Sequence, residues 1–147
     1  MSRRSVTCWP MVRGIGNGLS MGGVVARAEV MDSLGANSIS TFGGSPITTA
    51  GALANLGYLI DHDLQGNARR VGGLLKSRLE AVAARLDIVR EVRGRGLWQA
   101  LALADSEAGA VEAAARRRGL LVNAVKPDVV RLAPPLAGWS AARAATA

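Results

Sequence analysis

Cysteine and histidine, which often act in catalysis or bind metals, are scarce in this chain of 147 residues. It has one cysteine, Cys8, and one histidine, His62. A single cysteine excludes a disulfide within the chain and favours a reducing compartment, and one cysteine with one histidine cannot form a common zinc site, so no metal is expected. His62 stands between Asp61 and Asp63 at a predicted helix junction. There we expect a surface or capping residue and not a catalytic base.

Aromatic residues and lysines are also few, although the net charge is +7. Aromatics make up 3% of the chain, and the only lysines are Lys76 and Lys126. Arginine therefore supplies most of the positive charge, with short clusters at residues 69–70 and 116–118. No aromatic residues alternate with these clusters to stack on bases, so nucleic-acid binding is the least favoured interpretation. The second cluster ends a predicted helix, where cations stabilise the helix dipole.

No apolar run is long enough to cross a membrane. The longest run, residues 47–60, is too short for a bilayer. No apolar stretch follows the basic residues 1–4 before Pro10, so no signal peptide is expected. With 49% apolar and 20% charged residues, the composition is that of a globular protein. We therefore expect a cytoplasmic protein without a membrane partner.

The first half of the chain is predicted to contain one strand and two longer helices. Residues 1–12 are predicted to be irregular and residues 23–26 to form a short buried strand. Ser45 and Pro46 are typical of a helix start before the apolar residues 47–60. Since that helix is apolar on all sides, it belongs inside a larger body. An amphipathic helix capped by Asp61 or Asp63 follows.

The second half alternates strands with one helix, which favours a small α+β domain. Strands are expected at residues 88–92 and 97–103, separated by the turn RGRG at residues 93–96. A helix capped by Ser106 should run to about Arg118 and stop at Gly119. Two further strands are expected at the end of this half, at residues 120–122 and 129–132.

Two glycine-rich loops and the RGRG turn are the candidate binding elements. Backbone N–H groups in glycine-rich loops can approach an anion, and the hydroxyl of Thr41 can add a hydrogen bond to a phosphate. An arginine in a fixed turn suits a carboxylate because its planar guanidinium binds both oxygens. A plain turn is the alternative for each motif taken alone.

The order of the motifs resembles that of class III pyridoxal-phosphate aminotransferases. The segment after that family's Schiff-base lysine is similar to GIGNG at residues 14–18, and its threonine loop to STFGGSP at residues 40–46. Its C-terminal arginine motif is similar to VRGRGL at residues 92–97, and its final motif to RLAPPL at residues 131–136.

The resemblance implies an α/β fold, that of the fold-type-I pyridoxal-phosphate-dependent transferases. Residues 1–60 would form the end of the cofactor-binding large domain, residues 61–136 a small C-terminal α+β domain, and residues 137–147 a divergent tail. Ser40 and Thr41 would bind the phosphate of pyridoxal 5'-phosphate, with Thr41 reaching across a homodimer. Arg93 would bind the carboxylate of the substrate, an amino acid or a 2-oxo acid.

The chain also departs from the family's pattern. Arg13 stands where the family has its Schiff-base lysine, and a guanidinium neither forms the imine nor moves the proton. Only twelve residues precede Arg13, so the aspartate for the pyridinium nitrogen and the main phosphate cup are expected to be missing through truncation, a frameshift or a split gene. We therefore expect a partial aminotransferase with no intact catalytic residue, inactive alone. The alternative is a non-catalytic remnant or interaction piece that pairs with a full-length relative.

Overall fold

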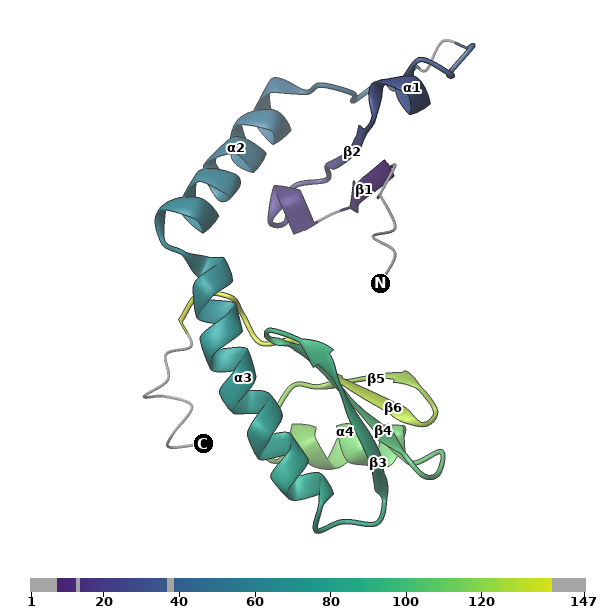
Figure 1. Ribbon diagram of the computed structural model, residues 1–147, viewed down its shortest axis with the longest axis vertical. Coiled ribbons are helices and arrows are strands. Elements are labelled where there is room, and N and C mark those ends of the chain that lie inside the picture. The colour runs from purple at the N-terminus through teal and green to yellow at the C-terminus, as the bar shows by residue number, and fades with distance from the viewer. Residues whose placement is uncertain (1–7, 13, 37–38, 139–147) are drawn as a thin grey trace. The chain divides into compact units, whose positions relative to one another are not determined.

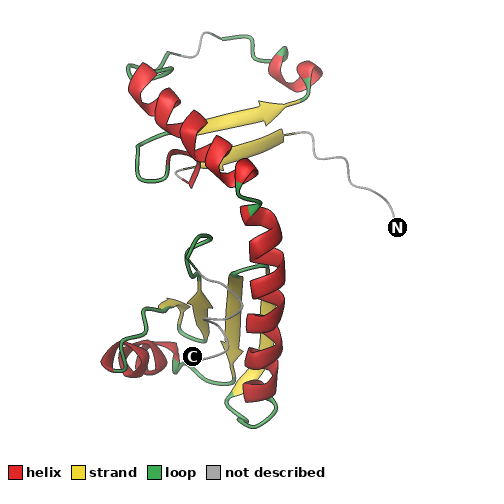
Figure 2. Cartoon of the chain, turned by 90° about the vertical axis from the view of Figure 1, so that its left-hand side faces the viewer, coloured by secondary structure: helices red, strands yellow, loops and turns green. Residues whose placement is uncertain are grey.

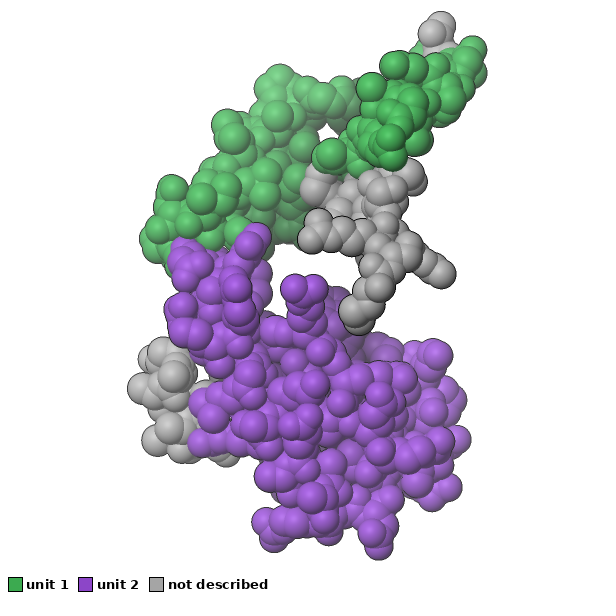
Figure 3. Space-filling model, viewed as in Figure 1, with its two compact units in different colours: residues 1–62 green, residues 63–147 purple. Residues whose placement is uncertain are grey.

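A computed structural model describes residues 8–12, 14–36 and 39–138 of the protein. The chain divides into two compact units, residues 1–62 and 63–147 (Figure 3). Each unit has its own sheet, of two strands in the first and four in the second. None of the helices in the described ranges is long and apolar enough to cross a membrane.

Unit 1 consists of a hairpin, two short helical turns and one long helix (Figure 1). Strand β1 (Cys8–Val12) pairs antiparallel with β2 (Gly22–Ala26), and the 3-10 turn η1 (Gly14–Gly16) lies between them. Helix α1 (Ala28–Met31) and helix α2 (Pro46–Asp61) follow. The prediction of a helix at residues 47–60 is confirmed, with Pro46 in its first turn.

Two expectations for unit 1 are wrong. Residues 8–12, predicted to be irregular, form a strand because β2 supplies hydrogen-bond partners for their backbone groups. The sequence of residues 8–12 by itself does not show that this partner exists. The strand at residues 22–26 is present but not buried, since Val24 and Val25 are 55% and 62% exposed. Two strands alone have no second layer to cover them.

Unit 2 is an α+β structure, in which helices accompany one antiparallel sheet (Figure 2). The strand order of this sheet is β3-β4-β6-β5. Helix α3 (Leu64–Ala83) precedes β3 (Val89–Arg95) and β4 (Trp98–Leu103). Helix α4 (Ala108–Arg117) then leads to β5 (Asn123–Lys126) and β6 (Val129–Leu132).

Unit 2 has two small cores. One is formed by Val71 of α3 and Leu97, which follows β3. The other joins the sheet to α4 through Leu103, Ala108 and Val130. The first core joins α3 to the turn between β3 and β4, and the second joins α4 to the sheet, so neither helix could bury its apolar face alone.

The caps of α3 and α4 test the predicted helix boundaries. Asp63 caps α3 as expected, because its Oδ1 accepts a hydrogen bond from the Gly66 amide at 3.1 Å. Ser106 does not cap α4, which has Glu107 at its N-cap and no side-chain hydrogen bond there. The helix instead starts where the amide of Ala108 donates to Pro127 O at 2.9 Å, a tertiary contact that replaces the expected local cap.

Strand boundaries in unit 2 also differ from expectation. Residues 93–95, predicted as part of a turn, extend β3 and pair with residues 98–100 of β4. Residues 120–122, predicted as a strand, precede β5, which begins at Asn123. In both places the cross-strand partner decides the boundary, and the local glycines and apolar residues do not.

Candidate functional site

The glycine-rich loop at residues 14–18 is a tight turn. Gly14–Gly16 form η1, and Asn17 and Gly18 follow with positive φ angles of 45° and 105°. The amide of Leu19 donates to Gly16 O at 3.0 Å and closes the turn. Arg13, which immediately precedes this loop, lies outside the described residues.

Helix α2 anchors this loop within unit 1. Asn55 Nδ2 donates to Ile15 O at 3.1 Å and is 3.4 Å from Gly14 O. A Cβ on Gly51 would lie 2.3 Å from Cδ1 of Leu19, so helix and loop pack closely at this glycine. Sequence reasoning did not single out Asn55, but it is the one side-chain amide within residues 47–60, and an amide in an apolar helix needs a partner.

Ser40 and Thr41 lie in a second tight turn, directly before α2. The Gly43 amide donates to Ser40 O at 3.1 Å, and the Ser45 amide donates to Phe42 O at 3.3 Å. Both hydroxyl-bearing residues are exposed. An exposed hydroxyl turn next to a helix N-terminus has the donors that suit a phosphate.

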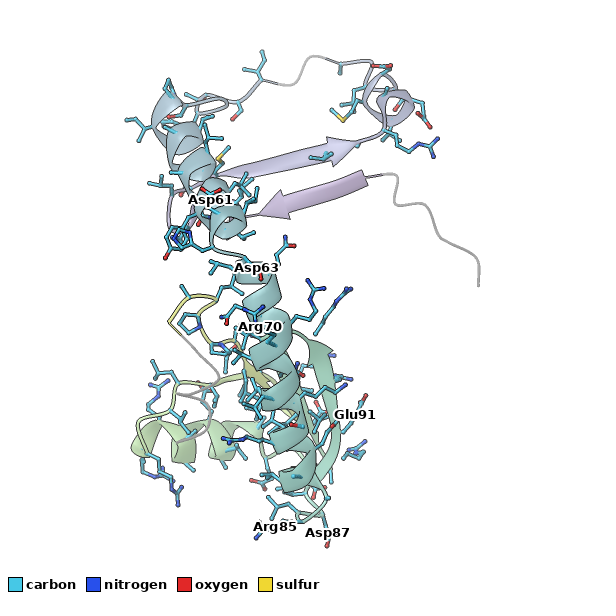
Figure 4. All side chains as sticks on the ribbon, turned by 60° about the vertical axis from the view of Figure 1, so that its left-hand side comes forward. Asp61, Asp63, Arg70, Arg85, Asp87 and Glu91 are labelled. Carbon is cyan, nitrogen blue, oxygen red and sulfur yellow. The ribbon has the colours of Figure 1, made fainter. Side chains whose placement is uncertain are left out.

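Arg93 lies in a row of side chains on one face of the unit 2 sheet. It pairs across the strands with Ala100 of β4, which pairs in turn with Arg131 of β6. Since directly paired residues point to the same face, the side chains of Arg93 and Arg131 start from either side of Ala100 on one face of the sheet. Arg93 Nη1 is 3.6 Å from Glu91 Oε2, and Figure 4 shows Glu91 on the same strand.

Arg131 is held in place by two neighbours. Its Nη2 donates to Asn123 Oδ1 at 2.9 Å, and its guanidinium carbon lies 5.0 Å from the centre of the Trp98 ring. The RLAPPL motif contains this arginine, but only the strand pairing shows that it shares a row with Arg93.

The remaining sequence candidates are structural. His62 is the C-cap of α2, where its Nδ1 lies 3.1 Å from Tyr58 O and its ring stacks on Tyr58 with 3.9 Å between the ring centres. That is the capping position expected of it. Among the described residues, no group of three histidine, cysteine, aspartate or glutamate side chains could hold a metal ion.

Comparisons with known proteins agree on one family. The sequence model of the class III aminotransferase family matches residues 8–144 of this chain. An acetylornithine aminotransferase of Mycolicibacterium smegmatis is 45% identical over 128 residues, which cover 86% of this chain and 32% of that protein. The chain thus spans about a third of the length of the curated relatives it matches.

Solved structures give the same result. An acetylornithine aminotransferase from Elizabethkingia anophelis aligns with a TM-score of 0.84 and 29% identity, over 95% of this chain and 38% of that one. A phospholyase from Arthrobacter, solved with phosphoethanolamine, aligns with a TM-score of 0.85 and 31% identity, over 95% of this chain and 36% of that one. The four motifs, the α/β fold and these matches together establish that the chain belongs to the class III aminotransferases.

Proposed function

We propose that this chain is one part of a class III aminotransferase and that it does not transfer amino groups by itself. The family is pyridoxal-phosphate-dependent and acts on amino acids and oxo acids. The observation that carries the proposal is the absence of a usable amine. Arg13 stands at the family's lysine position, and residues 1–62 contain no lysine at all.

The residues of the chain suit only the phosphate group of the cofactor. Bound pyridoxal phosphate would act as an electron sink for the substrate. The exposed hydroxyls of Ser40 and Thr41 suit its phosphate. The amine of the Schiff-base lysine has no comparable candidate in this chain. Lys76 Nζ lies 3.8 Å from Glu80 Oε1 on the surface of α3, and Lys126 is exposed at the end of β5. The donor set therefore does not fit the whole group, and no catalytic step is assigned to this chain.

The residues that fit a substrate are the arginines of the sheet in unit 2. Arg93 would bind the substrate carboxylate, and Arg131 lies in the same row on the other side of Ala100. Because Ala100 is small, both long side chains can reach an anion placed above it. This geometry supports a carboxylate site, and we propose that Arg131 shares it with Arg93.

The further assignments follow the family. In this proposal residues 1–60 belong to the large domain and residues 61–136 to the small domain, with residues 137–147 as a divergent tail. Thr41 contributes to the cofactor site of the partner subunit in a dimer. The dimer is formed either by identical chains or with a related chain, and it is located in the cytoplasm. Amino donors such as acetylornithine, named in the relatives, are candidate substrates.

A complementation experiment tests the proposal. The chain and its Arg13→Lys variant would each be produced alone and with the part of the Mycolicibacterium smegmatis relative that the chain does not match. Acetylornithine and 2-oxoglutarate would serve as substrates. We expect no turnover from either form alone, because Arg13→Lys supplies an amine but not the rest of the pocket. We expect turnover only from the lysine variant together with the supplied segment.

Borohydride reduction in the presence of pyridoxal phosphate gives a second readout. The chain alone should yield no labelled peptide that includes residue 13, and the complemented lysine variant should. Turnover by Arg13→Lys without a partner would contradict the proposal. So would a stoichiometric adduct at Lys76 or Lys126 that supports turnover, since it would reveal a substitute amine.

The second candidate function is that of an interaction piece that pairs with a full-length relative. Its support is α2, in which only Ala52 is buried. Ile47, Leu53 and Ile60 of this helix are 77%, 72% and 72% exposed. A helix with apolar side chains on so much exposed surface needs a covering surface. Co-purification with the full-length relative, without turnover in the complementation experiment, would favour this function over the first.

A further inference from the structure

Unit 2 contains a pocket of about 700 Å³ at one end of its sheet. The pocket is bounded by the first turns of α3, the hairpin between β3 and β4, and the segment that follows β6. Most of its wall is apolar, and its polar side chains are two arginines and one glutamine. The main apolar side chains are Leu97, Trp98, Pro134, Pro135 and Leu136.

The two arginines of this pocket are Arg69 from α3 and Arg95 from the end of β3. Neither makes an ion pair with another described residue, whereas Arg70 pairs with Asp63 and Arg93 pairs with Glu91. No carboxylate is among the described residues that line the pocket. The pocket thus combines an apolar wall with two positive charges that are not neutralised within the described part of the chain.

The hairpin that carries Arg95 is closely fixed. Gly96 has a φ of 57°, and a Cβ on Gly72 of α3 would lie 2.1 Å from its carbonyl carbon, so helix and hairpin touch through backbone alone. Gln99 is 1% exposed and donates from Nε2 to Gly96 O at 2.6 Å. A binding group on a rigid turn loses little entropy when it meets a ligand.

The other walls are held by separate contacts. Asn67 Nδ2 of α3 donates to Leu136 O at 3.0 Å and joins the end of the last segment to the helix. Trp98 is 61% exposed, and Arg131 lies over its ring. The indole therefore offers a planar apolar surface whose orientation is already set.

We propose that this pocket binds a small organic carboxylate with an apolar body. The carboxylate lies between Arg69 and Arg95, and the body packs on Leu97, Trp98 and the two prolines. The volume is within the usual range of ligand pockets, roughly 300–1,000 Å³, and so is the mixture of an apolar wall with few polar groups. This site does not include Arg93 and does not depend on the aminotransferase proposal.

Trp98 provides the readout. In the full chain with Trp9→Phe and Trp139→Phe, Trp98 is the only tryptophan. Titration with 4-phenylbutyrate should change its fluorescence saturably. The Arg69→Gln and Arg95→Gln variants should each weaken binding at least about ten-fold, because a charge-assisted hydrogen bond is lost. The neutral 4-phenylbutyramide, and acetate without the apolar body, should also bind at least about ten-fold more weakly.

The matched control is Arg117→Gln, which removes the same charge from the last turn of α4, away from the pocket lining, and should leave binding unchanged. Equal loss in this control, equal affinity for the amide, or no saturable change would overturn the proposal. The proposal would also be overturned if Arg93→Gln weakened binding as much as Arg95→Gln. That result would place the anion between Arg93 and Arg131 and not in this pocket. Equilibrium dialysis of labelled 4-phenylbutyrate with the unsubstituted chain repeats the test without the tryptophan changes. These binding measurements do not depend on aminotransferase activity. Failure of the complementation experiment would therefore not change the expected affinities.

Discussion

Gly72 and Gly73, adjacent in α3, have opposite surroundings. Glycine inside a helix costs about 1 kcal/mol relative to alanine, and the sequence alone gives both the same penalty. A Cβ on Gly72 would lie 2.1 Å from Gly96 C and 2.2 Å from Gly96 O, whereas a Cβ on Gly73 would have nothing within 4 Å. Gly72 is therefore required by the contact between helix and hairpin, and Gly73 is not.

This difference predicts opposite effects of the same substitution. Gly72→Ala should lower the free energy of unfolding of unit 2 by about 1–3 kcal/mol, because backbone atoms must move apart. Gly73→Ala should raise it by about 0.5–1 kcal/mol through helix propensity. Urea unfolding followed by circular dichroism measures both. Equal changes in the two variants would show that the close approach of Gly72 to Gly96 does not matter.

At the scale of elements, Asp63 determines where α3 begins. It has a left-handed φ of 45°, its Oδ1 accepts from the Gly66 amide, and its Oδ2 lies 3.3 Å from Arg70 Nη1. Figure 4 shows Asp63 and Arg70 together on the first turns of this helix. The exposed ion pair contributes little, so the cap carries most of the stabilisation.

Asp63→Ala should therefore lower the free energy of unfolding by about 1 kcal/mol, and more if alanine resists the left-handed conformation. Asp63→Asn keeps an oxygen acceptor and tolerates this conformation, so it should retain most of the stability. Arg70→Gln isolates the ion pair. If Arg70→Gln costs as much as Asp63→Ala, the pair and not the cap stabilises the start of the helix. The measurement is again urea unfolding.

At the scale of the whole molecule, the exposed apolar residues of α2 determine how the chain behaves in solution. Ile47, Leu53 and Ile60 together present apolar side chains that no described residue of unit 1 covers. We expect the isolated chain to self-associate, since such surface is removed from water by contact with other molecules.

The triple variant Ile47→Gln, Leu53→Gln, Ile60→Gln should reduce light scattering of the chain alone and also its co-purification with a full-length relative. The matched control places glutamine at Thr49, Ala50 and Ala54, three exposed positions of the same helix without large apolar side chains. If the control disrupts both properties equally, helix stability and not apolar contact explains them.

Much of this protein could be predicted from its sequence because the signals are local. Apolar periodicity, Pro46 and Asp63 predicted the two long helices, which are present. The four motifs predicted the family, and the comparisons confirm it. Arg13 and the absence of lysine from residues 1–62 depend only on residue identity. The roles of Ser40, Thr41 and Arg93 remain proposals.

Other features depend on contacts between distant segments and only the tertiary structure decided them. Strand β1 exists because β2 pairs with it, and α4 starts at Ala108 because Pro127 accepts its amide hydrogen bond. The sheet register places Arg93 and Arg131 on either side of Ala100. The pocket of Arg69 and Arg95 forms where α3 meets the hairpin at a glycine. Pairing and close approach are properties of two segments at once, so neither segment's own sequence specifies them.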